Sequence, residues 1–291
     1  MNAGDFSELF RVKSNTHVRL RDYDPAWTGS RKSKQELAEV IQENLERLTA
    51  AQELLWANEQ YALLMALQAM DTAGKDGLIK HVMSGVNPQG CQVSSFKQPS
   101  AEELDHDFLW RYHTKLPGRG HIGIFNRSHY EEVLVLRVHP ELLDRQKLPH
   151  RAHGKKLWKQ RYRDINAFEE HLARNGTIIL KFFLNISKRE QKKRLQERLE
   201  NPQKHWKFSP ADLAEREHWN EYMEAYQDAL SATSTDHAPW YIIPADNKWV
   251  SRWIVSEILV QTIHGLKLKP PKLTKDQQAA LAKAKRTLAK D

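Results

Sequence analysis

The stretch that decides the fold reads Ala69-Met70-Asp71-Thr72-Ala73-Gly74-Lys75-Asp76-Gly77, and its first two residues end the apolar run 61–70. The run is short enough for a buried strand, and a helical pattern begins where the quoted stretch ends. A glycine-bearing turn at a helix N-terminus presents backbone N–H groups to a phosphate, and the helix dipole favours its charge. The stretch therefore predicts a phosphate-binding loop between a strand and a helix.

Two positions depart from the common phosphate-loop pattern G-x-x-x-x-G-K-S/T, because Ala69 replaces the first glycine and Asp76 replaces the hydroxyl residue. Lys75 keeps its place and is expected to hold the transferring phosphoryl group. Because the hydroxyl that helps to bind Mg²⁺ is missing, we expect a carboxylate, Asp71 or Asp76, to hold the metal. The alternative is an accidental Gly-Lys pair in an ordinary turn. Phosphate contacts are expected from Thr72, Ala73, Gly74, Lys75, Asp76 and Gly77.

Four further apolar runs follow the first and alternate with helical patterns, which predicts an α/β fold with a five-stranded parallel sheet between two helical layers. Each run is apolar on both faces, as expected of strands covered from both sides. Ligands of such folds bind at the carboxyl ends of the strands. The strand candidates are 61–70, 91–97, 121–127, 177–186 and 240–245, and the helical patterns are 34–57, 77–84, 101–112, 129–138, 155–174, 187–199, 211–229 and 248–266.

The composition describes a basic globular chain of 291 residues, with 45 Lys and Arg against 37 Asp and Glu and a formal charge of +8. Such a surplus favours polyanions: nucleic acid, nucleotides, an acidic lipid surface or inorganic polyanions. No apolar run approaches the roughly 20 residues of a membrane-spanning helix, and the first residues lack a signal core. The single cysteine, Cys91, excludes an intramolecular disulfide and a cysteine-cluster zinc site. We expect a cytoplasmic protein.

The third strand candidate ends in a polar stretch where phosphate-loop enzymes usually carry an acid that helps to bind Mg²⁺. Here Asn126 takes that place, and a neutral amide binds metal less strongly. Glu131 and Glu132 follow one helical turn later and become candidates for metal or nucleotide contact, while Asn126 and Arg127 are expected in the site. Ser128 and Glu131 also have the spacing of a capping box.

A lysine- and arginine-rich helical pattern follows the fourth strand candidate, where small phosphate-loop kinases carry an arginine-rich lid. Arg194 and Arg198 lie four residues apart and share one helical face. The next residues, 201–210, form a loop of basic and aromatic side chains that includes Lys204 and Lys207. A solvated surface helix is the alternative, but its place in the chain favours a lid. The planar guanidinium of arginine matches phosphate oxygens.

Four ordered motifs together resemble the polyphosphate kinase type 2 family, closest to its single-domain class that acts on AMP and ADP. They are 69–77, 82–90 (VMSGVNPQG), 125–131 (FNRSHYE) and 201–208 (NPQKHWKF), and the resemblance covers roughly residues 19–268. The departures at Ala69, Asp76 and Asn126 are shared by that class. The resemblance implies a thymidylate-kinase-like core over 58–268 with a lid at about 187–212. Residues 1–57 would form an arm and helix, and 269–291 a basic tail helix.

The resemblance also implies reversible phosphoryl transfer between inorganic polyphosphate and adenine nucleotides with Mg²⁺ or Mn²⁺, in a homodimer or homotetramer. By position, Asp71 and Asn126 would hold the metal, and Lys75 the transferred phosphate. Lys204 and Lys207 would bind phosphates. The implied catalytic set is Asp71, Lys75, Arg127, Arg194 and Arg198, with Asn126, Arg127, Glu131 and Glu132 at the nucleotide.

A donor made only of phosphates needs a long positive channel rather than a base pocket, and Lys204, Lys207 and Arg119 are expected to line it. An ATP-dependent nucleoside monophosphate kinase is the main alternative, since it would use the same loop and lid. A nucleic-acid-binding module is the second. The sequence lacks a recognised nucleic-acid motif, so neither nucleic acid nor a membrane is expected as a partner.

Overall fold

The five predicted strands form one parallel sheet in the computed structural model, which describes residues 3–31, 33–148 and 154–289. The strand order is β2-β3-β1-β4-β5, and each neighbouring pair is parallel. β1 lies at the centre, so the quoted stretch begins at the middle of the carboxyl edge. The strands are β1 (Ala62–Gln68), β2 (Cys91–Ser95), β3 (Ile122–Asn126), β4 (Thr177–Asn185) and β5 (Trp240–Pro244).

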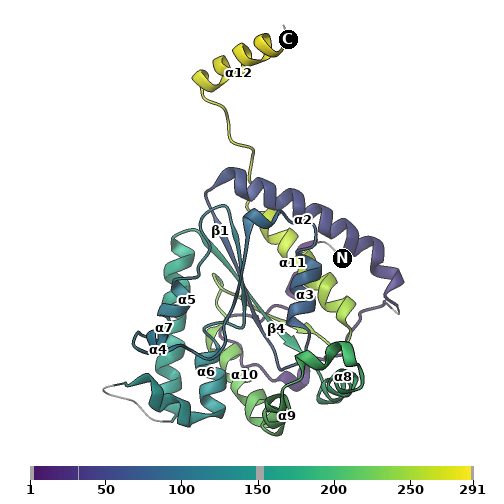
Figure 1. Cartoon of the computed structure of the whole chain (residues 1–291), viewed down its shortest axis with the longest axis vertical. Coiled ribbons are helices and arrows are strands. Elements are labelled where there is room, and N and C mark those ends of the chain that lie inside the picture. Colours follow the sequence, from purple (N-terminus) through teal and green to yellow (C-terminus); the bar gives the residue numbers. More distant parts are fainter. Residues whose placement is uncertain (1–2, 32, 149–153, 290–291) are drawn as a thin grey trace.

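Helices cover both faces of the sheet and confirm the predicted three-layer α/β/α architecture (Figure 1). On one side α11 contacts α2 and α3, and on the other α10 contacts α6 and α7. The first layer contains α2 (Ala38–Asn58), α3 (Lys75–Val82) and α11 (Lys248–Gly265). The second contains α5 (Trp110–His113), α6 (Glu131–Val138), α7 (Lys155–Arg174) and α10 (Trp219–Thr233).

The expectation that every strand is covered on both faces is right for β1 and wrong for β2. All seven residues of β1 are buried, because the central strand has neighbours on both sides and helices above and below. β2 lies at the edge of the sheet, and its side chains are half-buried or exposed, with Val93 52% exposed. Edge position, which the local apolar pattern does not encode, accounts for the difference.

Two predicted helices are each divided in two. The pattern 101–112 forms α4 (Ala101–Leu104) and α5, because the Asp107 carboxylate accepts a hydrogen bond from the Leu109 N–H and starts a new turn. The pattern 211–229 forms α9 (Pro210–Glu217) and α10, separated at His218. The capping box at Ser128 is also wrong. Its hydroxyl accepts a hydrogen bond from the Gln68 amide of β1 instead.

The N-terminal segment covers the outer edge of β5. The Val12 N–H donates to the Trp240 carbonyl and the Ile242 N–H donates to the Phe10 carbonyl, each at 2.8 Å. These two bonds add a short antiparallel bridge to an otherwise parallel sheet. The remaining elements before β3 are α1 (Ala3–Glu8), η1 (Leu20–Asp22), η2 (Gln35–Leu37) and η3 (Pro88–Gly90).

Two segments extend from the core. The predicted lid region contains α8 (Lys188–Glu200), η5 (Pro202–Lys207) and α9. The short helix η4 (Pro140–Gln146) follows α6. The basic tail forms the exposed helix α12 (Lys275–Leu288), which projects from the end of the molecule opposite α8 and α9 (Figure 1). Across the described ranges, no helix is both long and apolar enough to cross a bilayer.

Candidate active site

The loop between β1 and α3 has the backbone conformation of a phosphate loop. Gly74 lies in the left-handed region at φ 110°, where an L side chain is strained, so the glycine is needed at this turn. Thr72 is also left-handed, at φ 64°. α3 begins at Lys75 with its first N–H groups free for an anion. The predicted loop conformation is thus present.

Lys75 folds back over the loop, and its ammonium donates to the Ala69 carbonyl at 2.9 Å. Burial lowers the pKa of Lys75, while the carboxylates of Asp71, Glu131 and Asp76 act in the opposite direction. A cation held this way is poorly solvated, and a phosphate would replace the water it has lost. The side chain is therefore placed to bind a phosphoryl group at the helix N-terminus.

Asp76 and Asn126 meet across the end of the sheet, where the Asn126 amide donates to a carboxylate oxygen of Asp76 at 2.7 Å. The bond leaves the second carboxylate oxygen and the amide oxygen available. Mg²⁺ prefers such hard oxygen ligands, with substrate phosphates completing its shell. No group of three or more His, Cys, Asp or Glu residues that could hold a metal occurs among the residues described. The donor set thus fits a metal shared with phosphates.

Arg127 leaves β3 in a left-handed conformation, φ 64°, and reaches Asp71 at 3.2 Å. Both side chains are partly exposed, so they can exchange this ion pair for ligand contacts. Glu131, at the start of α6, lines the same cavity. Burial raises the pKa of Glu131, and the nearby Arg127 and Lys75 oppose that rise.

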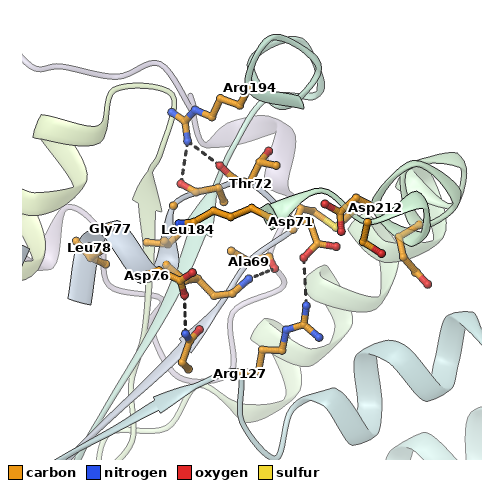
Figure 2. A pocket seen from close by; sticks show the side chains of 18 of the residues that line it. Ala69, Asp71, Thr72, Asp76, Gly77, Leu78, Arg127, Leu184, Arg194 and Asp212 are labelled. Atoms are coloured by element: carbon orange, nitrogen blue, oxygen red, sulfur yellow. Dashed lines mark hydrogen bonds and ion pairs between the residues drawn. The ribbon is translucent and has the colours of Figure 1, made fainter. Parts of the chain in front are cut away.

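Arg194 and Arg198 share a helix but have different surroundings. The Arg194 guanidinium donates to the carbonyls of Thr72 and Ala73 in the phosphate loop (Figure 2). Its other terminal nitrogen donates to the carbonyls of Ala245 and Asp246. It also pairs with Glu190 of α8, with 2.9 Å between the Nε and Oε1 atoms. Arg194 is only 6% exposed. It therefore joins α8 to the phosphate loop and to the end of β5.

Arg198 lies one turn further along and is held within the lid. Its guanidinium pairs with Asp212 of α9 at 2.6 Å and donates to the Lys207 carbonyl at 3.0 Å. Burial and the negative charge of Asp71 raise the pKa of Asp212, whereas Arg198 lowers it. Trp206, in the loop between these partners, is 78% exposed. A phosphate that enters here would compete with Asp212 for the guanidinium.

These side chains line one cavity of about 1000 Å³ at the carboxyl edge of the sheet. Figure 2 shows Arg194 and Arg127 on opposite sides of the loop that begins at Ala69. The cavity brings together the predicted loop residues 69–77, Asn126 at the end of β3, Arg127 directly after it, Glu131 and the cations of the predicted lid. Its cationic lining consists of Lys75, Lys97, Arg127, Arg194, Arg198, Lys204, Lys207, Lys248 and Arg252.

Three of the cations that line the cavity were not predicted from the sequence. Lys97 follows β2 and Lys248 begins α11 after β5, so the rule that ligands bind at carboxyl ends could have found them. Arg252 lies one turn further along α11. Tyr222 and Tyr226 of α10 also line the cavity, but their i, i+4 spacing is that of any packing face.

Two expected contributors lie elsewhere. The Glu132 carboxylate is buried away from the cavity, accepts bonds from Tyr112 and Gln146, and pairs with Arg161. Arg119 donates to the carbonyls of residues 60 and 175, at the opposite end of the strands. Neither residue lines the cavity. Arg119 precedes β3 and so lies at the amino ends of the strands, whereas Glu132 packs against Arg161 of α7.

A parallel sheet with a phosphate loop after its central strand and a basic lid defines a phosphate-loop kinase fold. Residues 30–271 match the family described as polyphosphate kinase 2 (PPK2). The chain belongs to this family of phosphotransferases and is an enzyme.

Close relatives share nearly the full chain. An ADP-polyphosphate phosphotransferase of Rhodopseudomonas palustris is 49% identical over 285 residues, covering 98% of this chain and 99% of the relative. An AMP/ADP-polyphosphate phosphotransferase of Meiothermus ruber is 48% identical over 266 residues, covering 90% and 94%. The crystal structure of polyphosphate kinase 2 from Arthrobacter aurescens TC1 aligns with a TM-score of 0.87 and 42% identity, covering 96% of each chain.

Proposed function

We propose that this enzyme transfers phosphoryl groups reversibly from inorganic polyphosphate to AMP, to ADP or to both. The names of the two relatives from Rhodopseudomonas and Meiothermus support both the donor and the acceptors. Their overlap with this chain is nearly complete, so the proposal concerns the whole enzyme rather than one module. The names of the relatives differ in the acceptor, so AMP, ADP or both are proposed here.

The observation that carries the donor assignment is the row of cations beyond the phosphate loop. Lys204 of the predicted lid and Lys248 and Arg252 of α11 line the cavity, and Lys248 is close enough to Arg194 and Lys204 to feel their charge. Burial and the nearby Arg194 and Lys204 lower the pKa of Lys248, although Glu197 acts against them. Cations that repel one another in a partly buried cavity favour a polyanion. A chain of phosphates would bind along such a wall.

The residues around the loop support an in-line transfer without a covalent intermediate. Lys75 and the N–H groups at the start of α3 would bind the phosphoryl group that moves. Arg127, on the other side of the loop, would orient the acceptor phosphate, whose oxygen attacks the terminal phosphorus. The bond from that phosphorus to the bridging oxygen breaks, and the polyphosphate leaves one phosphate shorter. Arg198 would leave Asp212 and stabilise charge on the equatorial oxygens. Positioning and electrostatics thus supply the catalysis.

Mg²⁺ or Mn²⁺ fits this arrangement as a bound cofactor. Asp71, Asp76 and Asn126 carry the hard oxygens that would hold it beside the phosphates. A bound divalent cation would neutralise phosphate charge during transfer. The homo-oligomer implied by the family resemblance and the cytoplasmic location expected from the composition stay predictions.

A two-donor assay tests the proposal. Purified enzyme with Mg²⁺ and AMP receives either long-chain polyphosphate or ATP, and chromatography follows the nucleotides. We expect ADP and then ATP to form from polyphosphate alone. Product from ATP only would favour the ATP-dependent nucleoside monophosphate kinase and would overturn the donor assignment. Supplying ADP in place of AMP separates the two acceptors.

A further inference from the structure

A buried charged cluster lies beneath the turn that links β3 to α6. It joins His129 of the turn, Glu169 of α7 and Lys181 of β4, and the three side chains are 0% exposed. Residues of these types are seldom fully buried unless they are paired. None of them lines the cavity, so none has a direct part in the proposed transfer.

Hydrogen bonds run from the sheet to the turn through this cluster. The Lys181 ammonium donates to Glu169 Oε2 at 2.6 Å and to the Thr233 carbonyl at 2.7 Å. Glu169 Oε1 in turn accepts from the Tyr130 hydroxyl at 2.9 Å and lies 3.0 Å from His129 Nε2. The carboxylate requires a proton on Nε2, so the pairing also sets the imidazole tautomer. His129 Nδ1 is buried and has no partner among the described residues.

The buried ion pair of Glu169 and Lys181 is not explained by a gain in stability alone. Burial alone would raise the pKa of Glu169, but Lys181 and the bond from His129 hold that pKa below its ordinary value. Burial also lowers the pKa of Lys181, and the charge of Glu169 and its hydrogen bond with Lys181 oppose that fall. An apolar pair of similar volume is often as stable as a buried ion pair, so stability alone is weak grounds for this arrangement.

The position of His129 in the turn between β3 and α6 indicates what the buried cluster does. Two residues before it, Arg127 has φ 64° and bonds through its N–H to the Leu67 carbonyl of β1 at 3.2 Å. Two residues after it, Glu131 begins α6 beside the phosphate loop. A turn in a left-handed conformation persists only when surrounding contacts hold it. Two side chains of the turn, those of His129 and Tyr130, reach the buried Glu169 and anchor the turn there.

We propose that His129 is a positioning residue: its bond to Glu169, which Lys181 fixes in turn, holds the 127–131 turn so that Arg127 and Glu131 face the acceptor phosphate. This inference rests on the proposed function, because it assigns the turn to nucleotide binding. It adds a residue that acts through Arg127 and touches no substrate.

Three variants separate positioning from stability. His129→Phe keeps the ring and removes the bond to Glu169, whereas His129→Gln retains an amide donor. The double variant Glu169→Met with Lys181→Met replaces the ion pair by apolar side chains and removes the acceptor of His129 without leaving a lone buried charge. Ser256→Ala is the matched control, since it removes a buried hydrogen bond from Asn44 far from the turn.

Each variant is measured for thermal unfolding, for KM of nucleotide and of polyphosphate, for kcat, and for ADP affinity by calorimetry without donor. We expect His129→Phe and the double variant to weaken ADP binding and raise the nucleotide KM about tenfold, with polyphosphate KM unchanged. His129→Gln should stay near the original enzyme. The Ser256→Ala control should change only the unfolding temperature.

Folded variants with unchanged ADP affinity and nucleotide KM would overturn the inference. Loss of the fold in His129→Phe and in the double variant would overturn it too, because the cluster would then serve the fold as a whole. If even the unaltered enzyme used no polyphosphate, the proposed donor would fail. The calorimetric ADP affinities would still decide the role of His129.

Discussion

The side-chain amide of Asn126 donates to the carboxylate of Asp76 at 2.7 Å, across the end of the central strands. In common phosphate loops a hydroxyl residue stands at the position of Asp76 and an acid at the position of Asn126. The two positions face each other here with the negative charge on the loop instead of on the strand. The site thus keeps one carboxylate and one neutral oxygen, but here the carboxylate is in the loop, at Asp76, and the neutral oxygen is at the end of the strand, at Asn126.

Asp76→Asn should weaken the use of metal more than it weakens the fold. The change keeps the size of the side chain and an oxygen for the Asn126 amide, but it removes the charge. We expect the half-saturating Mg²⁺ concentration to rise about tenfold. Titrating the initial rate with Mg²⁺ at fixed polyphosphate and nucleotide measures it. An unchanged Mg²⁺ requirement would remove Asp76 from the metal site.

Lys75→Ala should abolish most turnover while the protein stays folded. The ammonium is the charge that the loop places at the phosphoryl group, and removal of one such group costs about 100- to 1000-fold in rate. The loop keeps its Gly74 turn and its contacts with Arg194, so the unfolding temperature should change little. Steady-state rates with matched melting curves test this. A near-normal rate would exclude the loop from the mechanism.

Arg198→Lys should lower kcat without unfolding the lid. Lysine keeps the charge but loses the planar fork that matches phosphate oxygens, so we expect a loss of about tenfold or more. Asp212→Asn is the control, because it removes the carboxylate that holds Arg198 and leaves the guanidinium in place. A kcat that Arg198→Lys leaves untouched would contradict the lid assignment.

Arg194→Met should act mainly on stability. Its guanidinium satisfies the carbonyls of Thr72, Ala73, Ala245 and Asp246, and these buried or part-buried acceptors would lose their partner. We expect the free energy of unfolding to fall by about 3 kcal/mol. Urea unfolding followed by tryptophan fluorescence gives the value. A variant of full stability and low kcat would instead assign Arg194 to substrate.

The activity should depend on Glu131 at mildly acid pH. Burial raises the pKa of Glu131, so it takes up a proton at higher pH than an exposed glutamate and loses its attraction for Arg127. Glu131→Gln should flatten the acid side of the kcat/KM profile. Protonation of Glu131 at acid pH should lower the activity but raise the stability of the fold. A raised folded-state pKa adds stability below the unfolded pKa, and that stability is lost as pH rises through the folded pKa. An acid limb that persists in Glu131→Gln would assign it to another group.

Local sequence was sufficient for the sheet and the loop. β1 is an apolar run, and Gly74-Lys75 follows it at the position where a helix starts. The strand, the turn and the helix could therefore each be predicted from neighbouring residues. The same rule placed Asn126 and Arg127 at the end of β3. The order of the strands in the sheet could not be predicted from neighbouring residues. The edge position of β2 therefore produced the wrong expectation for its burial.

Contacts between distant segments limited the prediction of the site. Arg194 was expected beside Arg198 on a single phosphate-binding face, yet its partners are carbonyls 51 to 122 residues away along the chain. Glu132 was grouped with Glu131, but Arg161 of α7 lies against it on the other side of α6. Such partners are set by how helices pack on the sheet, which no local pattern records.

The projecting helix α12 gives this enzyme a natural point of attachment. It leaves the body at the end of the molecule opposite α8 and α9, and its residues are exposed (Figure 1). A support or a fused carrier joined beyond α12 would leave the mouth of the cavity open to solution. An immobilised catalyst that regenerates nucleotides could therefore be tethered by its C-terminal end with long polymer substrates still free to enter.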